Sequence, residues 1–261
     1  MSLLNVMTYK RIDYLLFSLL IAMSLSLVAC GMNKRNASNY FSDPIALEMA
    51  EAIDRSDTQA IKKLAKNIDI NTKGKRGMTF LIWAMGGELI ESYKTLLSLG
   101  IDTEAGLIGE EDSITTPLDI ATGLELPWMK LLLEAGSDIN QHIGRPRWWG
   151  ASLGNNWEVF DYLLLQPELD INAQSSSGYT EIMNLAGHEN YKQVLKLLNK
   201  GADIHLTTRR GNSFAYRVQT SVPHKNHKQF PYYQQVLKFL KGKGIVFPVK
   251  GPRELRGEKV E

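Results

Sequence analysis

The sequence has one cysteine, Cys30, so no disulfide can form within the chain. This number excludes the disulfide-stapled scaffolds of small secreted proteins. Net charge is also low, because 30 Lys and Arg residues stand against 28 Asp and Glu residues, which gives +2 at pH 7. A protein that binds nucleic acid by bulk electrostatics is therefore not indicated. Apolar residues make up 44% of the 261 positions, which is enough for a well-buried core.

Several signatures of catalysis and metal binding are missing too. The sequence contains no H-E-x-x-H or C-x-x-C motif and no glycine-rich phosphate-binding loop. His224 and His227 lie three residues apart, and a metal pair is conceivable there, but no carboxylate or cysteine lies nearby in the sequence. We identify no pair of nucleophile and base, and we expect no enzyme activity, no metal and no other cofactor.

Long hydrophobic runs are limited to one segment near the N-terminus. Lys10 and Arg11 supply positive charge, residues 14–28 form an uncharged apolar run, and the small Ala29 follows. This order is typical of a secretory signal peptide. A run of about 15 residues is shorter than the roughly 20 that a membrane-spanning helix needs.

The end of this segment, Leu27-Val28-Ala29-Cys30, resembles the lipobox of bacterial lipoproteins. In that family the cysteine receives a diacylglyceryl group, the chain is cut just before it, and the new amino terminus is acylated. The resemblance implies a signal peptide over 1–29, followed by a lipidated Cys30 and a linker over 30–42. The alternatives are a plain signal peptide with a nearby cysteine and a short uncleaved anchor.

Gly31 follows the cysteine. In enterobacterial lipoproteins an aspartate at this position favours retention in the inner membrane. The resemblance therefore implies a lipid anchor in the outer membrane, with the protein facing the periplasm.

The rest of the chain repeats a short marker that contains an aspartate. The segments "NIDIN", "GIDT", "GSDIN", "ELDIN" and "GADIH" place these aspartates at Asp69, Asp102, Asp138, Asp170 and Asp203. The intervals are 33, 36, 32 and 33 residues. A period near 33 is that of ankyrin repeats.

Helical patterns recur in phase with the marker. An apolar helix with leucines at i, i+3 and i+4 precedes the marker, and Gly100, Gly136 and Gly201 follow three of these helices, where a left-handed C-cap is expected. A shorter helix opened by a turn lies upstream, and its clearest copy is Thr116-Pro117-Leu118. These copies resemble the ankyrin signature G-x-T-P-L-H-x-A-A, although every copy has lost the histidine.

The resemblance implies an all-α ankyrin-repeat solenoid of about six helix-turn-helix units over residues 43–248. The first and last units are irregular, and the last contains an insertion over 219–231. A flexible tail over 249–261 is expected to follow. The alternative is an unrelated helical protein with a chance period.

Ankyrin solenoids bind proteins through their hairpin tips and the exposed side of each first helix, and the resemblance directs attention to those tips. One tip is acidic, with Glu104, Glu110, Glu111 and Asp112. Three are basic, with Lys73, Lys75 and Arg76, then Arg145 and Arg147, then Arg209 and Arg210. These charged tips either are exposed to solvent with no binding role or form a mainly basic track that meets an acidic protein partner.

Aromatic residues add to this candidate surface. Aligned on the signature, Trp148 takes the core leucine position and Trp149 the histidine position. Trp149 either packs between helices or is exposed as an anchor for a partner, and Tyr216 could line the same groove. The predicted partner-binding residues are Arg76, Arg145, Arg147, Trp149, Arg209, Arg210 and Tyr216.

Ankyrin-repeat lipoproteins of this size resemble immunity proteins that accompany type VI secretion phospholipase effectors. The resemblance implies a membrane-anchored antitoxin that binds and neutralises such a lipase, protecting against intoxication by sibling cells. One alternative is an ankyrin-repeat adaptor or scaffold of a cell-envelope protein assembly. Another is an accessory protein or degenerate hydrolase, against which the lack of an identified nucleophile-base pair argues.

Overall fold

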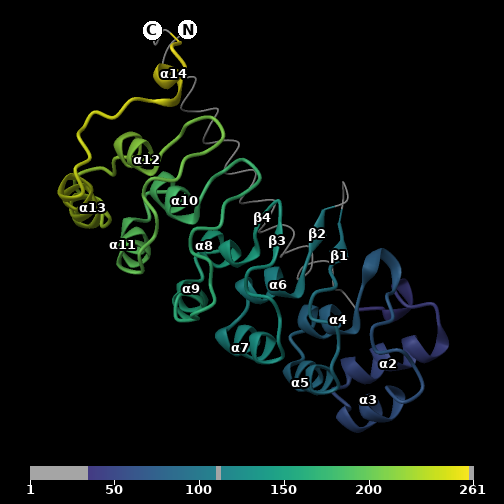
Figure 1. Ribbon diagram of the computed structural model, residues 1–261. Coiled ribbons are helices and arrows are strands. Elements are labelled where there is room, and N and C mark those ends of the chain that lie inside the picture. Colours follow the sequence, from purple (N-terminus) through teal and green to yellow (C-terminus); the bar gives the residue numbers. More distant parts are fainter. Residues whose placement is uncertain (1–34, 110–112, 259–261) are drawn as a thin grey trace. The chain divides into compact units, whose positions relative to one another are not determined.

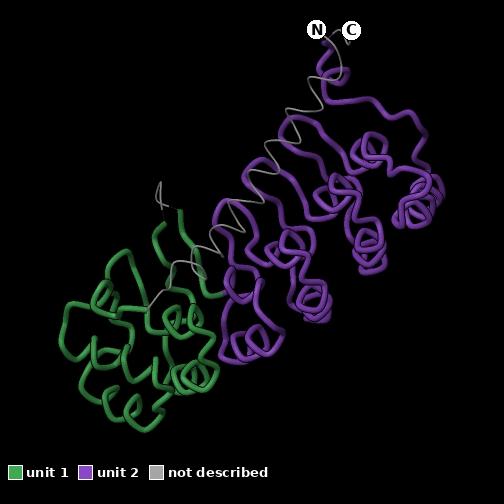
Figure 2. The backbone as a smooth tube through the Cα atoms, turned by 180° about the vertical axis from the view of Figure 1, so that it is seen from behind, with its two compact units in different colours: residues 1–117 green, residues 118–261 purple. Residues whose placement is uncertain are grey.

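The computed structural model describes residues 35–109 and 113–258. The predicted signal peptide and Cys30 lie outside these residues, as do Glu110, Glu111 and Asp112 of the acidic tip. The chain divides into two compact units, residues 1–117 and 118–261, which are coloured separately in Figure 2. Each unit is built from paired helices.

The described residues of unit 1 form two helix pairs and a short hairpin (Figure 1). The pairs are α2 (Pro44–Asp54) with α3 (Thr58–Leu64) and α4 (Phe80–Gly86) with α5 (Ile90–Ser98). The 3-10 turns are η1 (Ala37–Asn39) and η2 (Lys75–Gly77). Strand β1 (Leu107–Ile108) pairs antiparallel with β2 (Ile114–Thr115), with Leu107 opposite Thr115.

The described residues of unit 2 form four helix pairs, and the first helix of these has its first residue, Pro117, at the end of unit 1. The pairs are α6 (Pro117–Gly123) with α7 (Leu126–Glu134), α8 (Gly150–Leu153) with α9 (Trp157–Leu163), α10 (Glu181–Gly187) with α11 (Tyr191–Asn199), and α12 (Phe214–Thr220) with α13 (Phe230–Gly242). The other elements are β3 (His142–Ile143), β4 (Arg145–Pro146), η4 (Arg147–Trp149) and α14 (Pro252–Leu255). In Figure 1 the first helices α8, α10 and α12 lie between the hairpin turns and the second helices α9, α11 and α13.

Local chemistry explains where these helices begin and end. The Thr79 hydroxyl accepts a hydrogen bond from the Ile82 amide at 3.1 Å, and the Ser213 hydroxyl accepts one from the Tyr216 amide at 3.1 Å. Both are N-caps of a first helix. Gly100, Gly136 and Gly201 follow three second helices with φ of 77°, 92° and 87°. The left-handed C-caps predicted from the sequence are therefore confirmed.

The repeated aspartates all form the same turn. In each marker the aspartate Oδ1 accepts a hydrogen bond from the backbone amide two residues later, at 2.7–2.9 Å. The markers are those of Asp69, Asp102, Asp138, Asp170 and Asp203. Such a turn satisfies backbone donors that no helix covers, so the aspartate recurs once per repeat.

The core lies between the helices of each pair and between neighbouring pairs of a unit. Tyr93 and Leu96 are fully buried in unit 1, and Trp148, Phe160 and Tyr191 are fully buried in unit 2. Leu132, which follows the helical leucine pattern, is fully buried too. Six helix pairs with hairpin turns at one end confirm the predicted all-α ankyrin-repeat fold, because one pair alone could not bury its apolar face.

The segment predicted as a linker differs from that prediction between Arg35 and Phe41. Phe41 is 2% exposed and stacks on Phe80 with ring centroids 5.0 Å apart. The Arg35 guanidinium lies 4.2 Å from the Trp83 ring centroid and 3.5 Å from the Asp54 carboxylate. These apolar, cation-π and ionic contacts hold residues 35–41 against unit 1, so this part of the predicted linker packs on the first repeats.

The C-terminal tail, predicted to be flexible from residue 249, also contacts its unit. The Val249 amide donates to Gln219 Oε1 at 2.7 Å, and Gln219 Nε2 donates to the Val249 carbonyl at 3.2 Å. Helix α14 follows, and Arg256 Nη1 donates to the Arg210 carbonyl at 2.9 Å. The tail therefore packs along the sixth repeat as far as the structure describes it.

The predicted insertion lies between α12 and α13, and it too is held in place. The Tyr191 hydroxyl donates to the Ser221 carbonyl, and Gln229 Oε1 accepts from the Lys192 amide at 2.9 Å. Within the described residues, no helix is both long enough and apolar enough to cross a membrane.

Candidate protein-binding surface

The turns between the helix pairs of unit 2 are joined to one another by hydrogen bonds. The Ser176 amide donates to the Gly144 carbonyl at 2.7 Å, and the Arg209 amide donates to the Ser177 carbonyl at 3.1 Å. Gln174 Nε2 reaches the Thr207 carbonyl at 3.1 Å. We call these three turns, residues 142–146, 174–180 and 207–213, the fingers of unit 2. Their backbones form one connected surface on which side chains are presented.

Arg209 and Arg210 lie at the tip of the last finger, and both are exposed. A cavity of about 360 Å³ opens beside them. Its lining residues come from two fingers and are Ser176, Ser177, Tyr179, Thr208, Arg209, Arg210 and Asn212. Within residues 113–258 neither guanidinium makes an ion pair, so no carboxylate there neutralises either charge. These two predicted residues are available to a partner.

Arg145 and Arg147, on the first finger of unit 2 and the 3-10 turn that follows it, are held by Asp119 of α6. Arg147 Nη1 lies 3.2 Å from Asp119 Oδ2, and Arg145 Nη2 lies 3.8 Å from Asp119 Oδ1. The Arg147 side chain is 9% exposed and that of Arg145 is 33% exposed. Burial lowers the pKa of Arg145, and the Asp119 carboxylate opposes that effect. Arg147 therefore serves packing and charge balance, while Arg145 keeps part of its surface exposed.

A second buried carboxyl belongs to Glu181, at the start of α10. It is fully buried and contacts the Ser152 hydroxyl, and its Oε2 accepts from Asn184 Nδ2 at 3.3 Å. Burial raises the pKa of Glu181 to about 8 against smaller opposing effects of Ser152, Asn184 and Arg145. Glu181 is therefore mostly protonated at neutral pH, which avoids an uncompensated buried charge.

Ser152 lies in a short sequence pattern that the prediction of no enzyme activity did not take into account. Residues 150–154 read Gly-Ala-Ser-Leu-Gly, the G-x-S-x-G pattern of hydrolase nucleophiles. That motif needs an exposed serine on a turn between a strand and a helix. Here Ser152 is 6% exposed within α8, and its hydroxyl donates to the Trp149 carbonyl at 2.9 Å. The match is therefore a packing feature of the fourth repeat.

Trp149 is 2% exposed, so of the two roles open to it the structure shows helix packing. Its ring meets that of Trp148 edge to face, with centroids 6.4 Å apart. Trp148 packs against Phe160 at 6.2 Å, as expected for the core leucine position. The exposed anchor considered for Trp149 is excluded in this conformation, because almost none of the indole reaches solvent.

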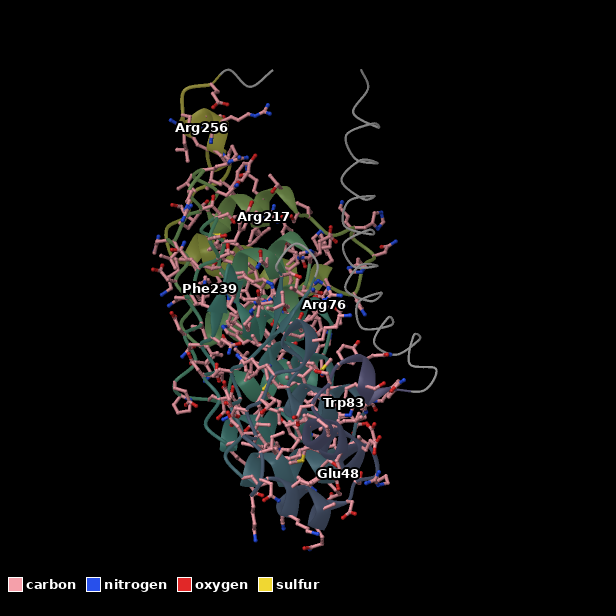
Figure 3. All side chains as sticks on the ribbon, turned by 90° about the vertical axis from the view of Figure 1, so that its right-hand side faces the viewer. Glu48, Arg76, Trp83, Arg217, Phe239 and Arg256 are labelled. Carbon is pink, nitrogen blue, oxygen red and sulfur yellow. The ribbon has the colours of Figure 1, made fainter. Side chains whose placement is uncertain are left out.

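Tyr216 belongs to unit 2 and Arg76 to unit 1, and each makes contacts within its own unit. Tyr216 packs against Gly251 of the tail so closely that an added Cβ at Gly251 would lie 2.8 Å from the ring. Arg76, labelled in Figure 3, is exposed on η2 of unit 1 with φ of 58°, and its Nε donates to the Ile108 carbonyl at 3.2 Å. The tail therefore covers part of Tyr216, while Arg76 remains an exposed residue of unit 1.

Two residues that hold this surface, Asp119 and Glu181, were not identified from the sequence. Both are acidic residues in the first turn of a first helix, where the signature has a histidine or a proline. An acidic residue at one of these signature positions is the available signal for both. Among the described residues, no group of three or more His, Cys, Asp or Glu side chains forms a metal site.

Comparison of the sequence with known proteins gives a partial match. No profile of a known protein family matches the chain. Protein PhlB of Serratia liquefaciens is 30% identical over 94 residues, which cover 36% of this chain and 40% of PhlB. The matched region thus spans well under half of that relative.

Two solved structures share the fold. A chain in the complex of the Bd0816 predatory endopeptidase from Bdellovibrio bacteriovorus with immunity protein Bd3460 is 23% identical, with a TM-score of 0.54, and the match covers 72% of this chain and 97% of that one. The ankyrin repeat protein EF0377 is 21% identical, with a TM-score of 0.56, and the match covers 73% and 96%. At these identities the likeness establishes the ankyrin fold.

Proposed function

We propose that this protein is a periplasm-facing lipoprotein, anchored in the outer membrane through Cys30, that binds and neutralises a phospholipase effector of a type VI secretion system. The fingers would cover the lipase or the entrance to its substrate site. Inhibition would then follow from occlusion, and the repeats would supply binding alone. Repeat proteins typically use the extended surface of their stacked units in this way.

The observation that carries the binding role is the set of exposed arginines on connected fingers. Arg209 and Arg210 lie on a turn whose backbone is bonded to the preceding finger. Arginine is enriched at protein interfaces, whereas lysine is depleted there. A backbone that is already ordered loses little entropy on association, which favours tight binding.

The comparisons support the inhibitory part of the proposal. A chain of this fold occurs in a complex between an endopeptidase and an immunity protein, which makes direct binding to an enzyme a reasonable mode of action. The similarity to PhlB covers 94 residues and is consistent with a shared repeat segment. The phospholipase target rests on the resemblance to ankyrin-repeat immunity lipoproteins.

The proposed anchor would act by concentrating the binder at the membrane. Arg35 contacts Asp54 and Trp83, so the folded domain begins five residues after Cys30. Five residues of chain reach at most about 18 Å. A lipidated Cys30 would therefore hold unit 1 within that distance of the bilayer, and its local concentration would exceed that of a free periplasmic protein.

The binding role is tested with the product of the adjacent gene, assayed for phospholipid hydrolysis, and with a chain that starts at residue 31, which keeps every described residue. We expect phospholipid hydrolysis to fall in proportion to added protein until one equivalent abolishes it. Arg209→Glu with Arg210→Glu should weaken inhibition, whereas Lys238→Glu with Lys241→Glu, on α13 of the same repeat, should not. Full lipase activity in the presence of excess protein would refute the proposal.

The anchor is tested separately in cells. We expect the unchanged protein to incorporate a labelled fatty acid and to float with outer-membrane vesicles, and Cys30→Ser to lose the label. An unlabelled wild-type protein would exclude lipidation while leaving the binding role intact.

A further inference from the structure

The cavity between the last two fingers has the composition of an oxyanion site. Its lining contains two guanidinium groups, three hydroxyl-bearing side chains from Ser176, Ser177 and Thr208, a phenol and the Asn212 amide. None of the lining residues is acidic. Guanidinium and hydroxyl groups donate hydrogen bonds, so the cavity presents donors without a matching acceptor of negative charge.

The two turns that form the cavity are fixed before any ligand arrives. The Gly178 amide donates to the Ser175 carbonyl at 2.8 Å, and the Gly211 amide donates to the Thr208 carbonyl at 2.8 Å, so both turns close in the same way. Gly178 has φ of 85°, and an added Cβ there would lie 2.9 Å from the Arg209 amide nitrogen. Glycine is therefore what lets the two fingers approach closely enough to share a cavity.

The surrounding sequence carries charge of one sign. Residues 204–253 contain ten Lys and Arg residues and no Asp or Glu, whereas the whole chain has a net charge of +2. Before the tail, these cations separate by type. The last finger and α12 carry Arg209, Arg210 and Arg217, and the insertion, α13 and the residue after it carry Lys225, Lys228, Lys238, Lys241 and Lys243. The tail carries one of each, Lys250 and Arg253.

We infer that the cavity between the last two fingers binds a carboxylate side chain of the partner protein, held by Arg209 and Arg210. This inference rests on the proposed function, because it names the chemistry by which that partner is recognised. A guanidinium group can hold both oxygens of a carboxylate in its plane, which a lysine ammonium cannot do. The acid-free sixth repeat adds long-range attraction that speeds encounter with an acidic surface.

A protein carboxylate fits the cavity better than a membrane surface does. The oxyanion donors are recessed between two turns, where one side chain can enter, instead of being spread over a flat face. A membrane patch would be expected to combine lysines with exposed apolar side chains. In the sixth repeat the lysines lie elsewhere, on α13 and near Val246, which is 81% exposed after that helix. The exposed Leu255, which lies near Gly211 of the last finger, is accompanied by arginines instead.

The test uses the chain from residue 31 with a fluorescent hexaglutamate peptide as the probe and hexaglutamine as its neutral counterpart. We expect the protein to bind hexaglutamate and not hexaglutamine. Arg209→Gln with Arg210→Gln should weaken that binding at least tenfold, whereas Lys238→Gln with Lys241→Gln, which removes the same charge from α13, should change it less than twofold. Equal weakening in the two double variants would overturn the inference.

Two further measurements keep the result decisive. Amide chemical shifts of the unchanged protein should move at Ser176, Ser177 and Asn212 on adding hexaglutamate, and shifts confined to α13 would place the site elsewhere. Sedimentation with phosphatidylglycerol vesicles but no binding of hexaglutamate would assign the charge to a membrane and refute the carboxylate site. Inhibition of the lipase without peptide binding would refute this site and leave the proposed function standing.

Discussion

The side-chain oxygen Oδ1 of Asn172 accepts a hydrogen bond from the backbone amide of Asp203 at 2.8 Å, across 31 residues. The same bond joins Asn140 to the Asp170 amide in unit 2 and Asn71 to the Asp102 amide in unit 1, both at 2.8 Å. The asparagine of one marker thus satisfies the backbone of the next. The repeated "D-I-N" segment is a staple between neighbouring repeats as well as a turn.

Replacing Asn172 with alanine is expected to cost about 1–2 kcal/mol, because the Asp203 amide is partly buried and would lose its acceptor. The control is Asn199→Ala, since the Asn199 side chain is exposed and makes no hydrogen bond within the described residues. We expect that change to stay within about 0.5 kcal/mol. Urea unfolding of both variants gives the comparison, and equal losses would contradict the staple.

The repeat architecture could be predicted from the sequence because its signals are local and recur. The turn of each aspartate involves residues two apart. The glycines that end the second helices directly follow them in the sequence. Such features are visible in a window of a few residues, and their period of about 33 residues shows that the units stack.

The contacts that the sequence did not predict connect residues far apart. Arg35 meets Trp83 across 48 residues, and Arg147 meets Asp119 across 28. The burial of Trp149 and the protonation of Glu181 likewise depend on how neighbouring repeats pack, which no single repeat specifies. The exposed Arg209 and Arg210 were predicted correctly as tip residues because tips are defined by the repeat itself.

Asp119→Asn is expected to destabilise the protein by about 3 kcal/mol, because it leaves the nearly buried Arg147 without its counter-charge. The control, Asp161→Asn, breaks a pair with Lys196 in which the aspartate side chain is 47% exposed, and it should cost under about 1 kcal/mol. Adding Arg147→Met to Asp119→Asn should recover part of the loss. Denaturant midpoints of the three variants and the unchanged protein give the comparison, and similar costs for both aspartates would contradict the buried pair.

Glu181 predicts a specific dependence of stability on pH. Its pKa is about 8 in the folded protein, against 4.5 for an ordinary glutamate. The stability that protonated Glu181 contributes to the folded protein is fully present below about pH 4.5 and is lost as the pH rises through 8. The reason is that Glu181 of the unfolded chain releases its proton at a lower pH than Glu181 of the folded protein does. The loss approaches about 1.4 kcal/mol per pH unit within that window.

Glu181→Gln isolates this effect, because glutamine keeps the shape and cannot ionise. We expect the free energy of unfolding of the unchanged protein to fall from pH 5 to pH 8 relative to that of the variant, with the curves converging near pH 4. Urea titrations at each pH provide the measurement. Two curves that run parallel across this range would mean that Glu181 ionises normally.

Phe41→Ala tests where the folded domain begins. The ring is 2% exposed and lies against Phe80 and Trp83, with centroid distances of 5.0 and 6.1 Å. Its removal should cost about 3–5 kcal/mol, as truncation of a buried phenylalanine does. The control is Asn39→Ala, two residues earlier and exposed, which should have little effect on the urea midpoint.

The outcome also bears on the proposed anchor. If Phe41 contributes this much, residues 35–41 belong to unit 1, and a lipidated Cys30 would hold the repeats close to the bilayer through a short segment. Limited proteolysis gives an independent reading, since a docked segment should resist cleavage in the unchanged protein and become sensitive in Phe41→Ala. A change of under about 1 kcal/mol, with rapid cleavage before residue 42 in both proteins, would restore the full linker predicted over residues 30–42 and lengthen the reach of the tether.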